Sequence, residues 1–88
     1  LRWMERLNKY ATIGERIVFY SLLVYMDWET LKCNPSMRTL ADDINISIGH
    51  IHKCLKGLET KNLISISNTQ LKGRFGRPPK EYTILLNR

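Results

Sequence analysis

Seven basic side chains lie between residues 50 and 80, where Glu59 is the single acidic residue. Residues 1–49 carry six basic and six acidic residues, and residues 81–88 carry one of each. The net charge of +6 therefore comes entirely from residues 50–80. Positive charge gathered on one part of a domain is typical of a surface that binds nucleic acid, whereas a merely solvated surface usually mixes both signs.

Three nearby side chains, His50, His52 and Cys54, could suggest a metal site. On a helix His52 points about 200° away from His50, so the three cannot converge on one ion, and zinc sites need three or four ligands. Asp42 and Asp43 also diverge as neighbours, so they do not form an acid–base pair. Without a phosphate-cradling glycine-rich loop or a Ser/His/Asp order, we expect no enzyme, no metal and no cofactor.

Residues 47–62 are predicted to form the helix that presents the first of these basic side chains. Ser47 is a favourable N-cap, and Ile46 and Ile51 occupy the two positions of a hydrophobic staple. Ile51, Leu55 and Leu58 are spaced i, i+4 and i+7, which makes one apolar stripe. The opposite face is small, polar and basic, and it carries Gly49, His50, Lys53 and Lys56, with His52 to one side.

The chain ahead of this helix is expected to be mostly helical. Residues 1–10 place Leu1, Met4 and Leu7 on one side of a short amphipathic helix, which either docks a partner or packs on its own domain. In the next segment the spacing predicts one long helix over residues 12–31.

That long helix is predicted to begin with a capping box formed by Thr12 and Glu15. Its apolar surface is wider than one stripe, so we expect it to be central to the core or buried in a dimer as well. For Trp28 we expect a core or interface position. Apolar residues recur at helical spacing at Ile13, Ile17, Tyr20, Val24, Trp28 and Leu31.

Pro35 breaks the helical pattern and favours an extended Asn34, so a short piece around Cys33 could pair with a later strand. Ser36 is expected to cap a short helix over residues 37–44, and Asn45 can adopt the left-handed conformation of a tight turn.

The period changes after residue 62. Residues 63–67 alternate as a strand, residues 68–80 read as a loop rich in glycine and proline, and residues 82–86 alternate again. These segments predict a β-hairpin around a basic loop.

With 88 residues, 43% of them apolar, the chain is expected to form one small domain. No apolar run approaches the roughly 18 residues of a membrane span. Cys33 and Cys54 are the only cysteines, and we expect reduced thiols in a cytoplasmic protein. The chain begins with Leu1, as a fragment of a longer protein would, and shows no signal peptide.

Residues 35–64 resemble the helix-turn-helix core of winged-helix DNA-binding domains, with the sequence PSMRTLADDINISIGHIHKCLKGLETKNLI. Residues 76–84, GRPPKEYTI, resemble the wing and its return strand. Asn45 and Asn62 stand where that family usually has glycine, for which asparagine is the common substitute. The matching positions are Pro35, Ser36, Leu40, Ala41, Ser47, Ile51, Leu55, Leu58, Leu63 and Ile64.

The resemblance implies an α+β winged-helix domain over residues 12–88, with a three-helix core, a two-stranded wing and an N-terminal helical arm over residues 1–11. The variant is similar to modules of plasmid and phage replication initiators and of prokaryotic transcription regulators. Such a protein would bind double-stranded DNA and would be nucleoid-associated.

The resemblance also implies which residues meet DNA. The helix over residues 47–61 would lie in the major groove, with Ile48, Gly49, His50 and Lys53 toward the bases. The contacts that position the protein on phosphates would come from Ser36, Arg38, Thr39, Ser47, His52 and Lys56. The wing over residues 72–80 would reach the adjacent minor groove through Lys72, Arg74, Arg77 and Lys80.

Two alternatives stay open. Gly76-Arg77-Pro78 either hooks into the minor groove or locks the start of the return strand. The whole domain could instead be a protein-interaction module that dimerises through the N-terminal arm and the first helix. RNA binding is less favoured because the strands lack an aromatic platform for stacking bases.

Overall fold

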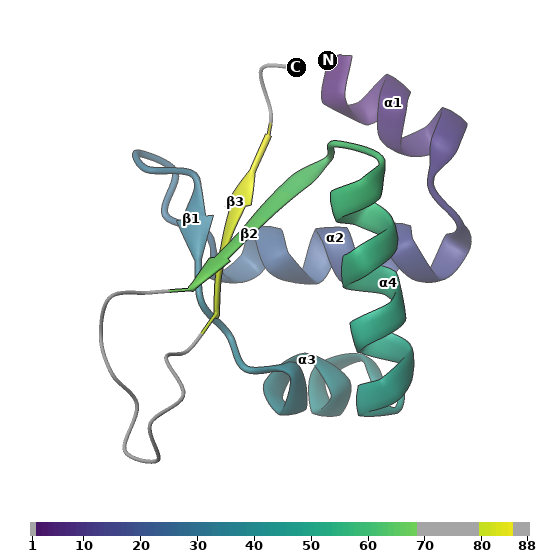
Figure 1. Ribbon diagram of the computed structural model, residues 1–88, viewed down its shortest axis with the longest axis vertical. Coiled ribbons are helices and arrows are strands. Elements are labelled where there is room, and N and C mark those ends of the chain that lie inside the picture. Colours follow the sequence, from purple (N-terminus) through teal and green to yellow (C-terminus); the bar gives the residue numbers. More distant parts are fainter. Residues whose placement is uncertain (1, 69–79, 86–88) are drawn as a thin grey trace.

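The computed structural model describes residues 2–68 and 80–85, and its helices enclose one side of a small antiparallel sheet (Figure 1). The prediction of an α+β fold, with a three-helix core, a C-terminal pair of strands and an extra N-terminal helix, is confirmed. In chain order the elements are α1 (Arg2–Tyr10), α2 (Ile13–Tyr25), β1 (Lys32–Cys33), α3 (Met37–Ile44), α4 (Ile48–Thr60), β2 (Ile64–Asn68) and β3 (Lys80–Ile84).

A tight turn joins α3 to α4. The C-cap of α3, Asn45, has φ 56° and ψ 48°, the left-handed conformation that ends the helix, and Ile46 N–H donates to the Ala41 carbonyl at 3.1 Å. Ser47 then caps α4 by accepting from His50 N–H at 3.2 Å. Ile46 and Ile51, the two residues of the predicted staple, both belong to the core: Ile51 is fully buried, and the partly buried Ile46 packs against the core cluster.

The helix predicted over residues 12–31 is shorter than expected, because α2 ends at Tyr25. Asp27 takes the backbone into a turn: its carboxylate accepts from Glu29 N–H at 2.8 Å, and its own N–H donates to the Lys32 carbonyl at 2.9 Å. Leu31 sits in the turn with φ 62°. An aspartate side chain that hydrogen-bonds to a nearby backbone N–H competes with the hydrogen bonds of a helix. Here the turn at Asp27 replaces the helix, although the apolar spacing continues beyond it.

Trp28 lies on this turn, and its side chain is 66% exposed. The expectation that it belongs to the core was therefore wrong for the single chain. Helical spacing was a misleading signal for Trp28 because the chain has already left the helix at Met26, the C-cap, which is extended with ψ 136°.

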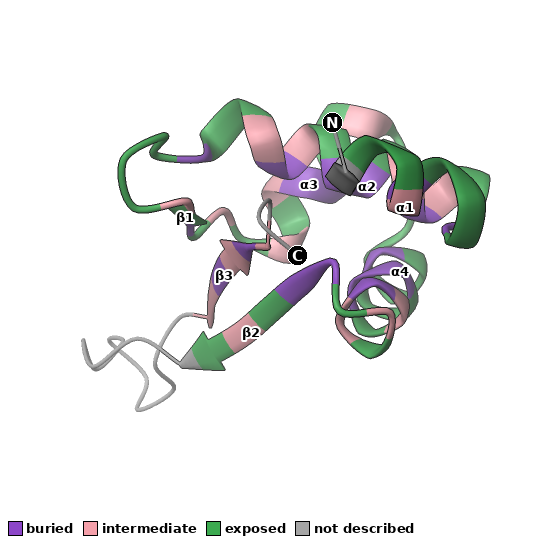
Figure 2. Cartoon of the chain, turned by 90° about the horizontal axis from the view of Figure 1, so that it is seen from above, coloured by how far each residue is buried: buried purple, intermediate pink, exposed green. Residues whose placement is uncertain are grey.

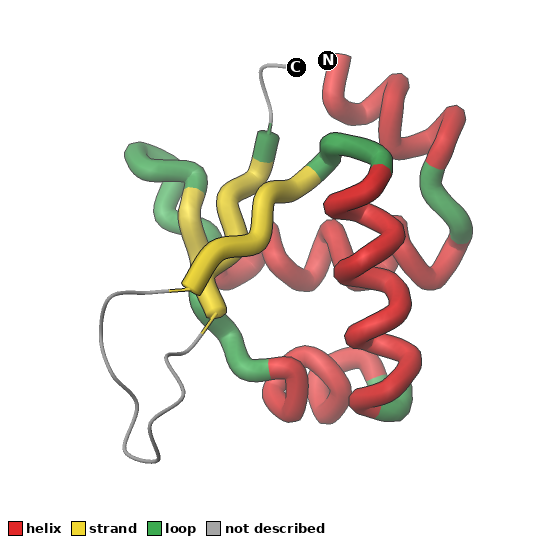
Figure 3. Tube along the Cα trace, in the orientation of Figure 1, coloured by secondary structure: helices red, strands yellow, loops and turns green. Residues whose placement is uncertain are grey.

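The sheet has the strand order β1-β3-β2, with both pairings antiparallel (Figure 3). β2 and β3 form the predicted hairpin, in which Ile66 faces Tyr82 and Asn68 faces Lys80. The extended piece at Cys33 pairs with β3 opposite Tyr82, as expected from Pro35. The loop of the hairpin, residues 69–79, falls outside the described residues.

The core lies between the sheet and helices α2, α3 and α4, where the buried residues line the inner faces (Figure 2). Phe19, Leu40, Leu58 and Tyr82 bring one large side chain each from α2, α3, α4 and β3. Helix α1 joins the same core through Leu7, which is fully buried. Of the two expectations for residues 1–10, packing on its own domain is the one seen.

Candidate nucleic-acid interface

The rotation of α4 about its own axis is set by its apolar stripe. Ile51, Leu55 and Leu58 are buried as predicted, and Cys54 is buried beside them. Because the helix turns 100° per residue, the side facing water carries the residues between these positions. The exposed residues on that side include Gly49, His52, Lys53 and Lys56.

The positive charges of α4 differ in how far they are neutralised within the domain. Lys61 pairs with Glu15, and Lys56 lies 3.7 Å from the Glu59 carboxylate at an exposed position. For Lys53 there is no ion pair within residues 2–68 and 80–85, so its charge is fully available on the outer face. Lys53 is thus the lysine of α4 whose charge is not paired within the described residues.

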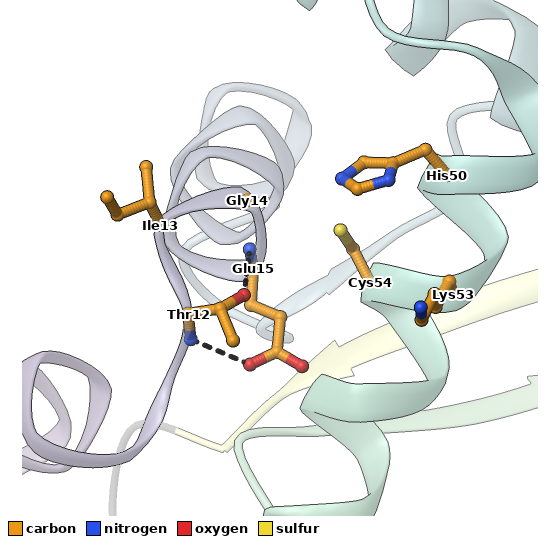
Figure 4. Close-up of a pocket in the computed structure, with 7 residues that line it drawn as sticks. All are labelled: Thr12, Ile13, Gly14, Glu15, His50, Lys53 and Cys54. Atoms are coloured by element: carbon orange, nitrogen blue, oxygen red, sulfur yellow. Dashed lines mark hydrogen bonds between the residues drawn. The ribbon is translucent and has the colours of Figure 1, made fainter.

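His50 lies at one flank of that face, where α4 meets the start of α2. A side-chain carbon added at Gly14 would come 3.1 Å from His50 Nε2 and 3.3 Å from Cys54 Sγ. Figure 4 shows both side chains directed toward Gly14. The glycine therefore lets the two helices approach closely, and the His50 ring lines their junction while staying exposed.

The junction forms a pocket of about 430 Å³ beside the outer face of α4. Its wall combines the first turn of α2 with the N-terminal half of α4 (Figure 4). The lining residues are Thr12, Ile13, Gly14, Glu15, His50, Lys53 and Cys54.

Glu15 ties α2 to the C-terminal end of α4. Its carboxylate accepts from Thr12 N–H at 2.9 Å and from the Lys61 ammonium, and its own N–H donates to Thr12 Oγ1 at 3.2 Å. A side chain at Gly57 would overlap this carboxylate, which would have to shift from its present position. The capping box was predicted from the sequence, but the partner 46 residues away was not.

The environment of Glu15 keeps its carboxylate charged. Burial by itself raises the pKa of Glu15, but the hydrogen bonds from Lys61 and the Thr12 backbone, with the Lys61 charge, outweigh burial and lower the pKa from 4.5. For the two thiols the effect of burial prevails: it raises the pKa of Cys54, and it raises the pKa of Cys33 to about 11. Both cysteines are free and inert at neutral pH.

Ser36 is the N-cap of α3. Ser36 Oγ accepts from Thr39 N–H at 3.0 Å and lies 2.9 Å from Thr39 Oγ1. Ser47 uses its hydroxyl in the same way for α4, so both serines hold helix ends while remaining exposed. Arg38 is exposed in the first turn of α3.

The predicted wing is described only at its end. Lys80 begins β3 and is partly exposed, whereas Lys72, Arg74 and Arg77 lie outside the described residues, as does Gly76-Arg77-Pro78.

Other kinds of site find little support in this part of the chain. Within residues 2–68 and 80–85, no three His, Cys, Asp or Glu side chains gather closely enough to hold a metal ion. None of the helices in the described ranges has both the length and the apolar character needed to cross a membrane.

Comparison with known proteins gives a likeness in structure and none in sequence. No family model matches the chain, and no curated protein matches it in sequence. A solved structure from Methanosarcina mazei Go1, named a "possible transcriptional regulator", aligns with a TM-score of 0.65 and 20% sequence identity. The alignment covers 93% of this chain but 61% of that one, so this chain spans less than two thirds of its neighbour. At this identity the likeness establishes the fold.

Proposed function

We propose that the domain binds double-stranded DNA in a sequence-specific manner, as part of a transcription regulator or a replication initiator. The observation that carries the proposal is the outer face of α4, which is basic and exposed and lies opposite a fully buried apolar stripe. A helix held in this way can enter the major groove with its N-terminal residues toward the bases. The fold shared with a possible transcriptional regulator supports the same function.

In this mode the tip of α4 reads the bases. Lys53 donates to guanine O6 or N7, Gly49 permits close approach, and Ile48, which is 47% exposed, contacts a thymine methyl. His50 donates from the flank of the helix. The remaining contacts are to phosphates and fix the register of the protein, from Ser36, Arg38, Thr39, Ser47, His52 and Lys56.

The wing over residues 72–80 completes the proposed interface. Lys72, Arg74, Arg77 and Lys80 supply four positive charges on a short stretch of chain. Arginines inserted into a narrow A·T-rich minor groove are favoured by its negative potential. The protein in this proposal is not an enzyme and acts on the nucleoid in the cytoplasm.

A binding measurement on duplex DNA tests the proposal. We expect the purified chain to bind a fluorescently labelled random-sequence duplex at low salt, measured by fluorescence anisotropy. Selection from a randomised duplex pool should then enrich one sequence. Absence of duplex binding at low salt contradicts the proposal.

A second candidate function is a protein-interaction module that forms homodimers. The observation that favours it is the exposure of apolar side chains on α2, among them Val24 at 79% and Ile13 at 70%. The N-terminal arm contributes less than the sequence suggested, since Leu7 is committed to the core of its own domain.

A further inference from the structure

Helix α2 carries apolar side chains on its core-facing side and on the opposite side, and the described residues cover only the first of these. Val18, Phe19 and Leu22 face the core and are fully buried. On the opposite side Ile17, Tyr20 and Val24, with Ile13 before them, follow the spacing i, i+4, i+7 and i+11. A helix with apolar residues on two opposite sides is normally enclosed by protein, and within residues 2–68 and 80–85 the outer side of α2 has no such cover.

This outer side borders a groove of about 540 Å³ between α2 and α3. The groove is lined by Ile17, Tyr20, Ser21, Val24, Asp43 and Ile44. Its only charged group, Asp43, already accepts a hydrogen bond from the Tyr25 hydroxyl. Asp43 raises the pKa of that hydroxyl, which therefore stays protonated and keeps donating. The groove thus presents a mostly apolar surface, and its one carboxylate has a hydrogen-bond donor within the domain.

No other element of the described chain covers the groove. Helix α1 is held at the far end of the molecule, where Arg6 Nη2 donates to the carbonyls of Lys61 at 3.1 Å and Asn62 at 3.3 Å. In Figure 1 α1 lies beside the C-terminal end of α4, whereas α3 lies at the opposite end. The N-terminal arm and the groove are therefore separate surfaces.

We propose that a second copy of this chain covers the groove, with α2 of each protomer packed against α2 and α3 of the other. This surface, called the α2–α3 surface, comprises Ile13, Ile17, Tyr20, Val24, Tyr25 and Ile44. The proposal deepens the second candidate function, which named the N-terminal arm and the first helix, by limiting the interface to α2 and adding α3, and it does not depend on DNA binding.

The area and chemistry of the α2–α3 surface suit a two-fold interface. Its exposed side chains on α2 leave roughly 500 Å² in water, taking large side chains at about 150–250 Å² each, which is more than half of the ~800 Å² that one partner buries in a standard interface. The same patch must face itself across a two-fold axis. It contains one charged side chain, Asp43, which lines the groove and accepts a hydrogen bond from the Tyr25 hydroxyl. It offers no charge pattern that would select a different protein.

The α2–α3 surface also leaves the basic face of α4 free. The buried side of α2 is the side that packs against α4, so the outer side points away from it. A dimer centred on Ile17, Tyr20 and Val24 leaves Lys56 uncovered, and only Ile13, at the edge of the surface, lines the same pocket as Lys53.

Sedimentation equilibrium on the full chain tests the proposal over a concentration series. Wild type is expected to approach twice its chain mass of 10.3 kDa. Val24→Lys places a charge on the α2–α3 surface and should weaken the dimer roughly tenfold or more. Lysine is a better helix former than valine, and position 24 is exposed, so the variant is expected to fold, which circular dichroism verifies.

Met4→Lys is the matched control, because Met4 is an exposed apolar residue of α1 at 38%. It should dimerise like wild type. A monomeric wild type, a Val24→Lys variant that dimerises as well as wild type, or loss of the dimer in Met4→Lys alone would each overturn the proposal. DNA binding is measured separately on the same proteins. A protein that dimerises but does not bind DNA contradicts the proposed DNA function and does not contradict the proposed interface.

Discussion

At the scale of single residues, Glu15 shows both the reach and the limit of sequence reasoning. Its capping box with Thr12 is a local pattern, three residues apart, and was predicted. Its ion pair with Lys61 joins two distant elements, and one sequence holds no signal for such a pairing. Lys61 was therefore counted among the charges available to a ligand, although it is committed inside the domain.

Replacing Glu15 with glutamine is expected to lower the free energy of unfolding by about 1–3 kcal/mol at neutral pH, since it leaves the Lys61 charge unpaired at a buried site. The folded pKa of Glu15 lies below 4.5, so its contribution is complete above that pH and is lost as pH falls through the folded pKa. Urea denaturation of wild type and variant should show a difference that shrinks on acidification. Glu59→Gln removes an exposed ion pair and should cost about 0.5 kcal/mol or less.

At the scale of elements, caps and turn residues predicted more than apolar spacing did. Ser36, Ser47 and the left-handed Asn45 and Asn62 are where the sequence placed them, because a cap or a turn is decided by a few neighbouring residues. Spacing alone extended α2 through Asp27, where a local backbone alternative prevailed. Apolar spacing also does not indicate which side of α2 faces the core, because apolar residues occur on two opposite sides of this helix.

The docking of α1 is a second property of elements, and Arg6 is expected to dominate its polar part. Arg6 donates to two carbonyls at the C-terminal end of α4, which are groups that need donors. Arg6→Ala should lower the free energy of unfolding by about 1–2 kcal/mol and speed amide hydrogen exchange in α1. Lys9→Ala is the control on the same helix, where the ammonium lies over the Tyr10 ring. Equal effects of the two changes would show that Arg6 does not anchor the arm.

At the scale of the whole molecule, the order of the predicted elements was enough to predict the fold, whereas the sequence predicted the candidate DNA interface only in outline. Charge counting placed the positive excess in residues 50–80. Folding then divided that excess, since Lys61 is tied to Glu15 and Lys53 is left at the surface. Which charges remain available depends on contacts between elements, and these are set by packing.

The salt dependence of DNA binding measures those available charges directly. The logarithm of the affinity should fall linearly with the logarithm of salt concentration, with a slope of about −0.9 per phosphate contacted. Lys56→Ala is expected to weaken all duplexes alike and to reduce the slope by about one phosphate, whereas Lys53→Ala should relax the preference among sequences. Lys32→Ala is the control, because Lys32 lies in β1 and pairs with Glu81 at 3.7 Å. An unchanged slope in Lys56→Ala would remove Lys56 from the proposed phosphate contacts, and equal loss of slope in Lys32→Ala would show that the effect reflects net charge rather than a contact on α4.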